Sequence, residues 1–484
     1  MARAPTEGGG FVSAQEVTPL SQEVHFALVQ THARAQKVRQ LVRVLLPIFV
    51  TQVAISAVNV IDAMMSGRFS PVDLAGVAIG TNVWLPLSTC LTGVMSALTP
   101  IVAQLLGAGR AREVRAAVFQ GLCLAAVVAL ILMALLRAAI PPVLRLMHLE
   151  PEVHKIARDY LFAISWGAVP HLLYAVLRSF FDALGYTSVT MAITLASMPI
   201  NVFFNYLLIF GAFGFPRLGG VGAGYASAVT YWAVFLVGAW AASRSAPFSE
   251  YEVFRWPQRG PGLERPHWKE HLRVGVPIGL AILAEVSVFS GVGLLMSRFG
   301  TLAIAAHQAA LSFASLLYMA PLSISMALTI VVGFEVGAGR IRDAMEYRRL
   351  GIAGALSFAA LAATALTLGN RFIASLYTRD AELLELLRAF LHFAVFFQFF
   401  DALAAPVQGT LRGYKDVNAV LAVVLVSFWC AGLPAGHLLA VFSPLGPFGY
   451  WTGLILGLLF GATGLLWRLR RTERAHASLT RPSP

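Results

Sequence analysis

The chain is a succession of long apolar runs, and short segments containing Gly, Pro or charged residues separate them. A run of about 20 apolar residues crosses the apolar core of a bilayer as an α-helix. The pattern predicts twelve spans, some long enough to require tilt or kinks. Their expected bounds are 44–66, 77–105, 117–140, 159–181, 188–211, 222–243, 274–297, 303–334, 350–372, 386–410, 417–440 and 449–467.

One short phrase occurs twice, about half a chain length apart. Residues 98–112 read LTPIVAQLLGAGRAR and residues 328–342 read LTIVVGFEVGAGRIR. Each repeat contains an even number of spans, so both copies enter the membrane in the same orientation. The predicted fold class is therefore an all-α polytopic membrane protein, with twelve transmembrane helices in two six-helix bundles related by a parallel internal repeat. We interpret the Gly-Ala-Gly-Arg strings as helix C-termini.

Basic residues gather in the segments between spans. With the N-terminus placed inside, most of the 36 Lys and Arg residues fall on the inner side, as the positive-inside rule expects of cytoplasmic loops. Both termini are therefore predicted to be cytoplasmic. The expected organisation is a cytoplasmic N-terminal tail (1–40), an amino lobe (41–243), a cytoplasmic linker (244–273), a carboxy lobe (274–468) and a cytoplasmic C-terminal tail (469–484).

Composition narrows the functional classes. Hydrophobic residues make up 58% of the chain and charged residues 12%, whereas a soluble domain has about 25% charged residues. The net charge of +12 lies mainly in inner loops, so we expect no nucleic-acid partner. The three Cys residues lie in apolar runs and have no Cys/His ligand set around them, which favours neither a disulfide nor a zinc site. No Walker motif is present, so we expect neither ATP as the power source nor any bound cofactor.

Three acidic residues lie inside predicted spans, where a charge costs at least about 2.5–3.5 kcal/mol on insertion scales. Asp62 falls in the outer half of the first span. Glu285 is 12 residues from Arg273, and Asp401 precedes Arg412 by 11 residues, so both are expected near the midplane. Each acid could serve an interhelical hydrogen bond alone. Three in one chain, two of them at matched depth, favour a transport function.

Amides supply candidate partners for these acids. Asn201 and Asn205 are four residues apart and share a helix face. Their carbonyl groups could complete a cation shell around Asp62 or hydrogen-bond its protonated form, although two amides could also simply join helices. Gln308, beside His307, is expected to line a cavity.

Two further acids end their spans beside basic loops. Asp182 and Glu335 occupy inner span ends in the sequence. We interpret both as solvated.

A carboxyl group in apolar surroundings resists ionisation, so it takes up a proton or binds a cation such as Na⁺. Two acids that face one cavity also attract an organic cation, and competition between the two kinds of cation gives exchange. One positive charge that moves inward across 100 mV releases about 2.3 kcal/mol, enough to support a gradient of more than tenfold. The pattern therefore predicts secondary antiport.

Over residues 40–470, the chain resembles the multidrug and toxic compound extrusion (MATE) transporters, in their bacterial NorM-like branch. The resemblance is carried together by the strings VIDAMMSG, LTPIVAQLLGAGR, LRSFFDALG, LGGVGAGYASAVTYW, AEVSVF, AAHQAALSF and FDALAAPVQGTLRGYKD.

The resemblance implies two helical bundles around a cavity that opens alternately outward and inward. It implies export of drugs or metabolites, often cationic and aromatic, in exchange for Na⁺ or H⁺, by a multi-pass protein of the bacterial cytoplasmic membrane that we expect to be a monomer. Asp62, Asn201 and Asn205 would form an amino-lobe cation site. Glu285 and Asp401 would form a carboxy-lobe site that could hold Na⁺. Substrate would meet Asp401, Glu285, Gln308 and Asp62.

The chain departs from the family pattern at two positions. Family members often carry Tyr one turn before the acid of the tenth span, where this chain has Phe397. Another branch carries Asp where this chain has Asn205. Both departures remove an oxygen ligand or a charge, so the choice between Na⁺ and H⁺ stays open.

Three alternatives compete with this interpretation. A flippase for lipid-linked saccharides, of the same broad superfamily, would be expected to line its cavity with Arg or Lys, and the spans here are poor in deep basic residues. A major-facilitator-type carrier has the same repeat symmetry but fits the motifs less well. A membrane-embedded enzyme would need a nucleophile–base pair or a metal set inside the spans, and the sequence contains no such catalytic residues.

Overall fold

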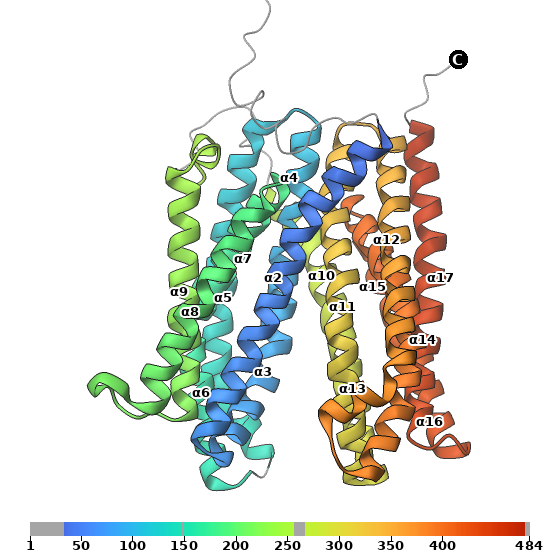
Figure 1. Ribbon diagram of the computed structural model, residues 1–484. Coiled ribbons are helices and arrows are strands. Elements are labelled where there is room, and N and C mark those ends of the chain that lie inside the picture. Colours follow the sequence, from blue (N-terminus) through green and yellow to red (C-terminus); the bar gives the residue numbers. More distant parts are fainter. Residues whose placement is uncertain (1–32, 148, 256–266, 480–484) are drawn as a thin grey trace, which may run out of the picture.

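The computed structural model describes residues 33–147, 149–255 and 267–479, and these residues form helices without a strand among them. They divide into two lobes that stand side by side in Figure 1, with α2–α9 in one and α10–α17 in the other. The amino lobe consists of α2 (Arg34–Phe69), α3 (Pro71–Met95), α4 (Leu98–Gly107), α5 (Ala111–Leu146), α6 (Pro151–Ser165), α7 (Ala168–Ala183), α8 (Thr187–Phe210), η2 (Ala212–Gly214), α9 (Gly220–Arg244) and η3 (Phe248–Tyr251).

The carboxy lobe repeats the pattern of long apolar helices. It consists of α10 (His267–Leu295), η4 (Met296–Phe299), α11 (Gly300–Gly337), α12 (Ile341–Leu368), α13 (Asn370–Tyr377), α14 (Ala381–Gly413), α15 (Val417–Val424), the π-helical η5 (Leu425–Gly432), α16 (Leu433–Phe442) and α17 (Phe448–Leu479). The segment α15–η5–α16 is one continuous crossing, because it runs without a break from residue 417 to residue 442.

Length and composition identify ten helical segments of the described chain that could cross a membrane, or eleven when the bent pair α6 and α7 counts as one. One of the ten, His267–Gly337, has 71 residues, which is far longer than a single crossing needs. The turn η4 and Gly300, with a φ of +86°, divide it into α10 and α11. Counted as two crossings, this segment raises the total of eleven, which includes the bent pair, to the predicted twelve.

The predicted spans match the helices, and the helices extend beyond them at several ends. The first helix begins at Arg34 rather than at residue 44, and α17 continues to Leu479, past its expected end at residue 467. The predicted ninth span ends too late, because Gly369 separates α12 from the short helix α13. The end turns of these helices are charged or polar and lie outside the apolar core of the bilayer. A hydropathy pattern therefore marks the apolar part of a helix and misses its polar ends. The rest of both predicted tails and the middle of the predicted linker lie outside the described residues.

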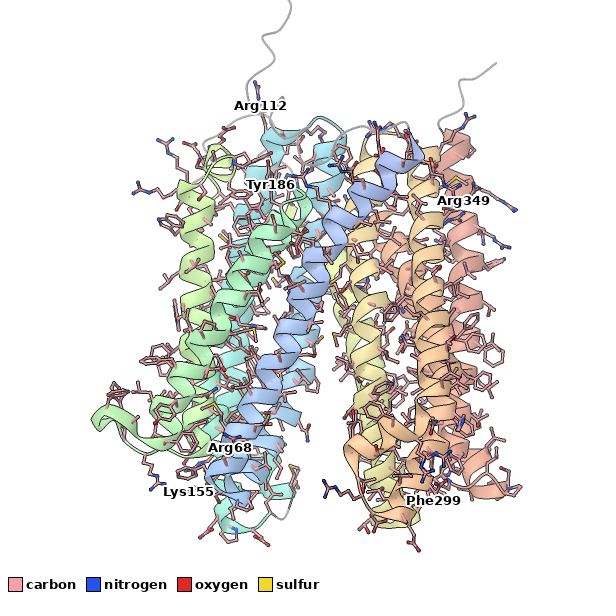
Figure 2. The ribbon with its side chains drawn as sticks, viewed as in Figure 1. Arg68, Arg112, Lys155, Tyr186, Phe299 and Arg349 are labelled. Carbon is pink, nitrogen blue, oxygen red and sulfur yellow. The ribbon has the colours of Figure 1, made fainter. Side chains whose placement is uncertain are left out.

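The two lobes meet at one end of the bundle. We call this the basic end, because Arg112 and Arg349 lie there in Figure 2, whereas Arg68, Lys155 and Phe299 lie at the opposite end. The repeated phrases form the centre of the junction. A Cβ atom on Gly107 would lie 2.0 Å from the carbonyl oxygen of Phe334, and one on Gly337 would lie 2.2 Å from that of Gln104. The backbones of α4 and α11 therefore touch at the first glycine of each Gly-Ala-Gly-Arg string.

The second glycine of each Gly-Ala-Gly-Arg string ends its helix. Gly109 has a φ of +71° and Gly339 a φ of +73°, a backbone region that favours glycine. Both copies close with the same hydrogen bond, from Arg110 N to Leu105 O at 2.8 Å and from Arg340 N to Glu335 O at 2.9 Å. This pattern is a Schellman motif, so each Gly-Ala-Gly-Arg string does end a helix, as interpreted from the sequence.

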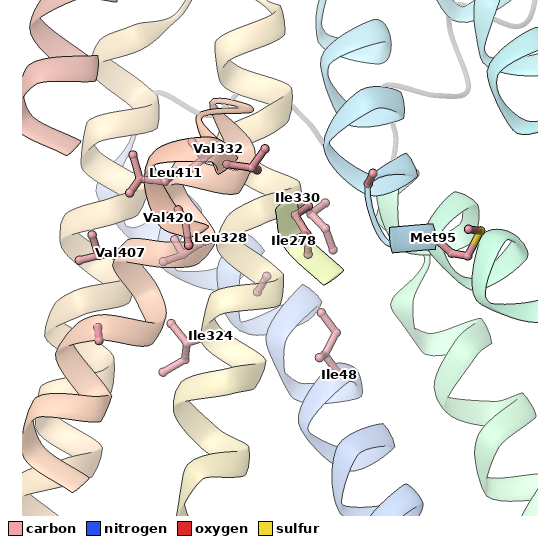
Figure 3. Close-up of a cluster of buried hydrophobic side chains, with 14 of the residues drawn as sticks. Ile48, Met95, Ile278, Ile324, Leu328, Ile330, Val332, Val407, Leu411 and Val420 are labelled. Atoms are coloured by element: carbon pink, nitrogen blue, oxygen red, sulfur yellow. The ribbon is translucent and has the colours of Figure 1, made fainter. Parts of the chain in front are cut away.

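The hydrophobic core is continuous across this junction. Ile48 and Met95 from the amino lobe belong to the same buried cluster as Ile278 and Leu328 from the carboxy lobe, as Figure 3 shows. A second buried cluster, which includes Val77, belongs to the amino lobe alone. Apolar packing therefore joins the lobes in the half of the bundle near the basic end.

Asp182 and Glu335 are not solvated, so that interpretation is wrong. Asp182 is 4% exposed and accepts a hydrogen bond from Thr190 at 2.9 Å, with Arg178 3.6 Å away. Glu335 is 2% exposed and pairs with Arg340 at 2.6 Å. Asp182 pairs with an arginine one turn earlier on its own helix, and Glu335 pairs with Arg340 of the basic loop that follows it.

Candidate functional site: acids between the helices of each lobe

The amino lobe brings Asp62 on α2 against α8. Asn205 donates from Nδ2 to Asp62 Oδ1 at 2.5 Å and to Asn201 Oδ1 at 2.8 Å. The two asparagines are essentially fully buried, and Asp62 is half-buried. The spacing of four residues places both amides on the face of α8 that packs against α2, as the sequence predicted.

The polar groups of this cluster are incompletely satisfied. Asn205 Oδ1 and Asn201 Nδ2 are buried and have no hydrogen-bond partner. A buried polar atom without a partner is costly, and most such atoms in native proteins are paired. The unpaired amide oxygen beside a carboxylate is the arrangement that a bound cation, or a proton donor, would complete.

A third helix contributes a residue that sequence reasoning missed. Ser227 on α9 donates from Oγ to Asp62 Oδ2 at 3.3 Å. Serine is common in apolar helices, where it usually bonds to its own backbone, so no signal in the sequence distinguishes Ser227. The small residues of α9 around it, in GVGAGYASA, do indicate a close helix approach.

Aromatic side chains surround this site. Tyr160 and Tyr231 lie within electrostatic reach of Asp62. The Tyr160 hydroxyl is 3.2 Å from Thr81 Oγ1, and the ring of Tyr231 lies 4.6 Å from that of His171. The surroundings of Asp62 are therefore apolar, aromatic and hydroxyl-bearing, and they contain no basic residue that acts on Asp62 among the described residues.

The carboxy lobe brings Glu285 on α10 together with α14. Gln408 donates from Nε2 to Glu285 Oε1 at 2.9 Å. Asp401, on the same helix as Gln408, is close enough to interact electrostatically with Glu285, and no hydrogen bond to Asp401 is formed within the described chain. Both acids are half-buried. The structure thus brings the two acids of matched sequence depth within electrostatic range of each other.

Tyr318 on α11 is a second residue that sequence reasoning missed. Its phenol lies within electrostatic reach of Asp401, Glu285 and Arg412. A tyrosine within an apolar run, in SLLYMAP, is the signal that could have drawn attention to it. Tyr318 brings a hydroxyl to these acids from another helix, whereas Phe397 is buried in ring contacts with Phe289 and Trp451.

The remaining predicted residues lie apart from the two acid clusters. Gln308 is exposed and faces α10 near Gly293. His307 is fully buried and accepts a hydrogen bond at Nδ1 from Trp451 Nε1 at 3.1 Å, so it packs within the carboxy lobe. In the described part of the chain, no group of three or more His, Cys, Asp or Glu side chains could hold a metal ion; any cation would rely on amide and hydroxyl oxygens as well as the acids.

Comparison with known proteins identifies the fold family. The MatE family model matches the chain twice, over residues 47–207 and 277–438, so each lobe corresponds to one copy of the same unit. This agrees with the internal repeat in the sequence.

Curated relatives match almost the whole chain. The probable multidrug resistance protein NorM of Bacillus subtilis is 48% identical over 451 residues, which cover 93% of this chain and 98% of the relative. The protein of the same name from Bacillus anthracis is 49% identical over 449 residues, with the same coverage.

Solved structures show the same fold at low sequence identity. The eukaryotic MATE transporter AtDTX14 matches with a TM-score of 0.82 at 20% identity, over 93% of this chain and 100% of that one. A multidrug resistance MATE family transporter of the MOP superfamily, in an outward-facing conformation, matches with a TM-score of 0.81 at 19% identity over the same shares. The family model and the relatives at 48–49% identity lead to one conclusion: the chain belongs to the MatE family, in its NorM-like branch.

Proposed function

We propose that this protein is a secondary antiporter that exports organic compounds, often cationic and aromatic, in exchange for Na⁺ or H⁺. The observation that carries the proposal is the juxtaposition of Glu285 and Asp401 inside the carboxy lobe, together with Asp62 in the amino lobe. Half-buried acids without a full set of counter-charges bind an inorganic or an organic cation in turn. The multidrug resistance relatives support the same activity.

The closed junction at the basic end fits one state of an alternating-access cycle. By the positive-inside rule, the basic end faces the cytoplasm, so both predicted termini are cytoplasmic and the described conformation is shut toward the inside. Transport then requires the lobes to part at α4 and α11. We further propose that the protein acts as a monomer in the bacterial cytoplasmic membrane and performs no catalysis.

The decisive experiment is transport of an ethidium-like dye by the purified protein in liposomes, with the Na⁺ gradient and the pH gradient imposed separately. One gradient alone is expected to drive dye movement against its concentration. Dye movement that needs ATP, or that ignores both gradients, would refute antiport.

Site variants connect that activity to the acids. Glu285→Gln and Asp401→Asn are each expected to reduce dye transport at least tenfold at unchanged protein content of the membrane. Glu382→Gln is a matched control, because Glu382 is exposed at the start of α14. Full activity in both site variants would exclude the carboxy-lobe site.

The flippase alternative receives no support from the multidrug resistance relatives. It would also require a basic cavity for a pyrophosphate, whereas the residues around Asp62 are amides, hydroxyls and aromatic rings.

A further inference from the structure

The side-chain amide of Gln408 lies between Arg412 and Glu285. Arg412 lies in the last turn of α14, four residues after Gln408. Its Nη2 donates to Gln408 Oε1 at 3.4 Å, while Gln408 Nε2 donates to Glu285 Oε1 at 2.9 Å. The side chain of Gln408 therefore bridges a guanidinium and a carboxylate that do not touch. Gln408 itself is buried, at 8% exposure.

The charge of Arg412 has no ion-pair partner among the described residues. Its Nε is buried and makes no hydrogen bond. Other arginines near the basic end do pair with acids: Arg340 with Glu335, Arg348 with Glu473 and Arg468 with Asp416. An unpaired guanidinium at a half-buried position is unfavourable, so a structural role would be expected to give Arg412 a carboxylate as well. Glu285 is the acid on which its charge acts.

Among the described residues of the amino lobe, no equivalent cation acts on Asp62. The groups that act on Asp62 are Asn205, Ser227 and Asn201, all uncharged. The two lobes therefore differ in their counter-charges. When a cation leaves Asp62, the carboxylate has no positive group near it, whereas when a cation leaves Glu285, the guanidinium of Arg412 is nearby.

We propose that Arg412 is a tethered counter-cation that replaces the coupling cation at Glu285 when that cation leaves toward the basic end. The inference rests on the proposed function of the carboxy-lobe site. While the coupling cation is bound, Gln408 holds the guanidinium away from the carboxylate. As the cation leaves, Arg412 takes its place on Glu285, and this competition favours release toward the side on which Arg412 lies. Arg412 is thus a positioning residue that sets how tightly the site holds its cation.

The test measures cation binding directly, apart from transport. Equilibrium binding of ²²Na⁺, and proton uptake on a pH jump, would be measured on purified Arg412→Gln, Arg412→Lys and Gln408→Leu proteins in detergent. We expect Arg412→Gln to bind the coupling cation on the order of tenfold more tightly and to turn over dye more slowly. We expect Arg412→Lys to stay close to the unaltered protein, because it keeps the charge.

For Gln408→Leu we expect the opposite change in cation affinity. Loss of the separating amide lets Arg412 pair with Glu285, so cation affinity should fall. A merely structural role for Arg412 would weaken binding in both Arg412→Gln and Gln408→Leu, and that result, or unchanged affinity in Arg412→Gln, would overturn the proposal. Arg371→Gln, on the exposed helix α13, controls for the loss of one positive charge.

Glu285→Gln in the same assay separates the two ideas. If Glu285→Gln abolishes cation binding and Arg412→Gln leaves it unchanged, only the role of Arg412 is refuted. If Glu285→Gln itself binds the cation normally, the carboxy-lobe site of the proposed function fails, and the role of Arg412 fails with it.

Discussion

The ammonium group of Lys37 on α2 lies 2.7 Å from a carboxylate oxygen of Asp343 on α12 and ties the two lobes together at the basic end. Lys37 is 2% exposed and also pairs with Glu346. Tyr347 adds a hydrogen bond to Gln40 at 3.1 Å across the same junction. Alternating access requires these groups to separate, so their attraction contributes to the stability of the shut state.

Reversing the charge of Lys37 should therefore open the basic end. Breaking a buried ion pair from one side costs about 3–5 kcal/mol, and Lys37→Glu also places a third negative charge beside Asp343 and Glu346. We expect spin labels at Arg112 and Arg349, on opposite lobes, to report longer distances in Lys37→Glu. The labels require replacement of the native cysteines Cys90, Cys123 and Cys430 by Ala.

The double variant Lys37→Glu with Asp343→Lys should partly restore the short distance, because it re-forms one attractive pair. Lys155→Glu, an exposed position at the opposite end, should leave the label distance unchanged. A Lys37→Glu protein with the unaltered distance distribution would show that other contacts hold the junction shut.

The glycines of the repeated phrase give a steric counterpart to that electrostatic experiment. A methyl group at Gly107 or Gly337 would lie 2.0–2.2 Å from a carbonyl oxygen of the other lobe. The rigid helix backbones cannot move locally to relieve this clash, so the lobes must move apart. Gly107→Ala and Gly337→Ala should each destabilise the shut state by about 1–3 kcal/mol, the usual cost of overpacking. The measurement is the same pair of spin labels.

Gly354→Ala is the matched control, because Gly354 lies within α12 and a Cβ there would meet nothing within 4 Å. Alanine also favours a helix more than glycine does, so this control should be neutral or slightly stabilising. If Gly107→Ala behaved like Gly354→Ala, the close approach of α4 and α11 would have no part in closing the lobes.

The fold could be predicted from the sequence because the membrane enforces a simple rule. Apolar runs of bilayer length must be helices whose backbone groups are satisfied internally, and the repeated phrase gave the parallel duplication. The ends of α2 and α17 were placed less well, since their polar turns carry no hydropathy signal. The pairing of α4 with α11 through Gly107 and Gly337 cannot be predicted, because the Gly-Ala-Gly-Arg strings indicate helix ends and not which helix packs against them.

The acids of the candidate site could be predicted because a charge inside an apolar span is conspicuous. The spacing of Asn201 and Asn205 likewise placed two amides on one face. Ser227 and Gln408 could not be singled out, because their positions beside the acids depend on how α9 and α14 pack against α2 and α10. Tyr318 carried one signal, a tyrosine within an apolar run. The burial of Asp182 and Glu335 cannot be predicted either, because a position beside a basic loop does not reveal whether an acid is solvated or folded in against an arginine.

The amino-lobe cluster predicts a selective defect in coupling. Asp62→Asn removes the charge and retains the size of the side chain, so we expect the ion dependence of dye transport to be lost while dye still binds. Ser227→Ala should have a smaller effect, a few-fold change in the half-saturating cation concentration, since its 3.3 Å bond to Asp62 is long. Dye transport by liposomes over a series of Na⁺ and pH gradients measures both. Unaltered ion dependence in Asp62→Asn would remove this cluster from the coupling mechanism.

Tyr318 offers the final prediction, since its phenol lies within electrostatic reach of Glu285 and Asp401, whereas the helix that carries Asp401 has Phe397 one turn before the acid. Tyr318→Phe removes only that oxygen, and the loss of one hydrogen-bonding ligand to a charged group costs about 1.5–3 kcal/mol, so cation affinity at the carboxy-lobe site should fall by at least tenfold. Dye binding, which depends on ring area more than on the hydroxyl, should change little. Tyr377→Phe, at the end of the peripheral helix α13, is the control for a lost tyrosine hydroxyl. Equal cation affinity in Tyr318→Phe and in Tyr377→Phe would mean that Tyr318 packs beside Glu285 and Asp401 without binding what they bind.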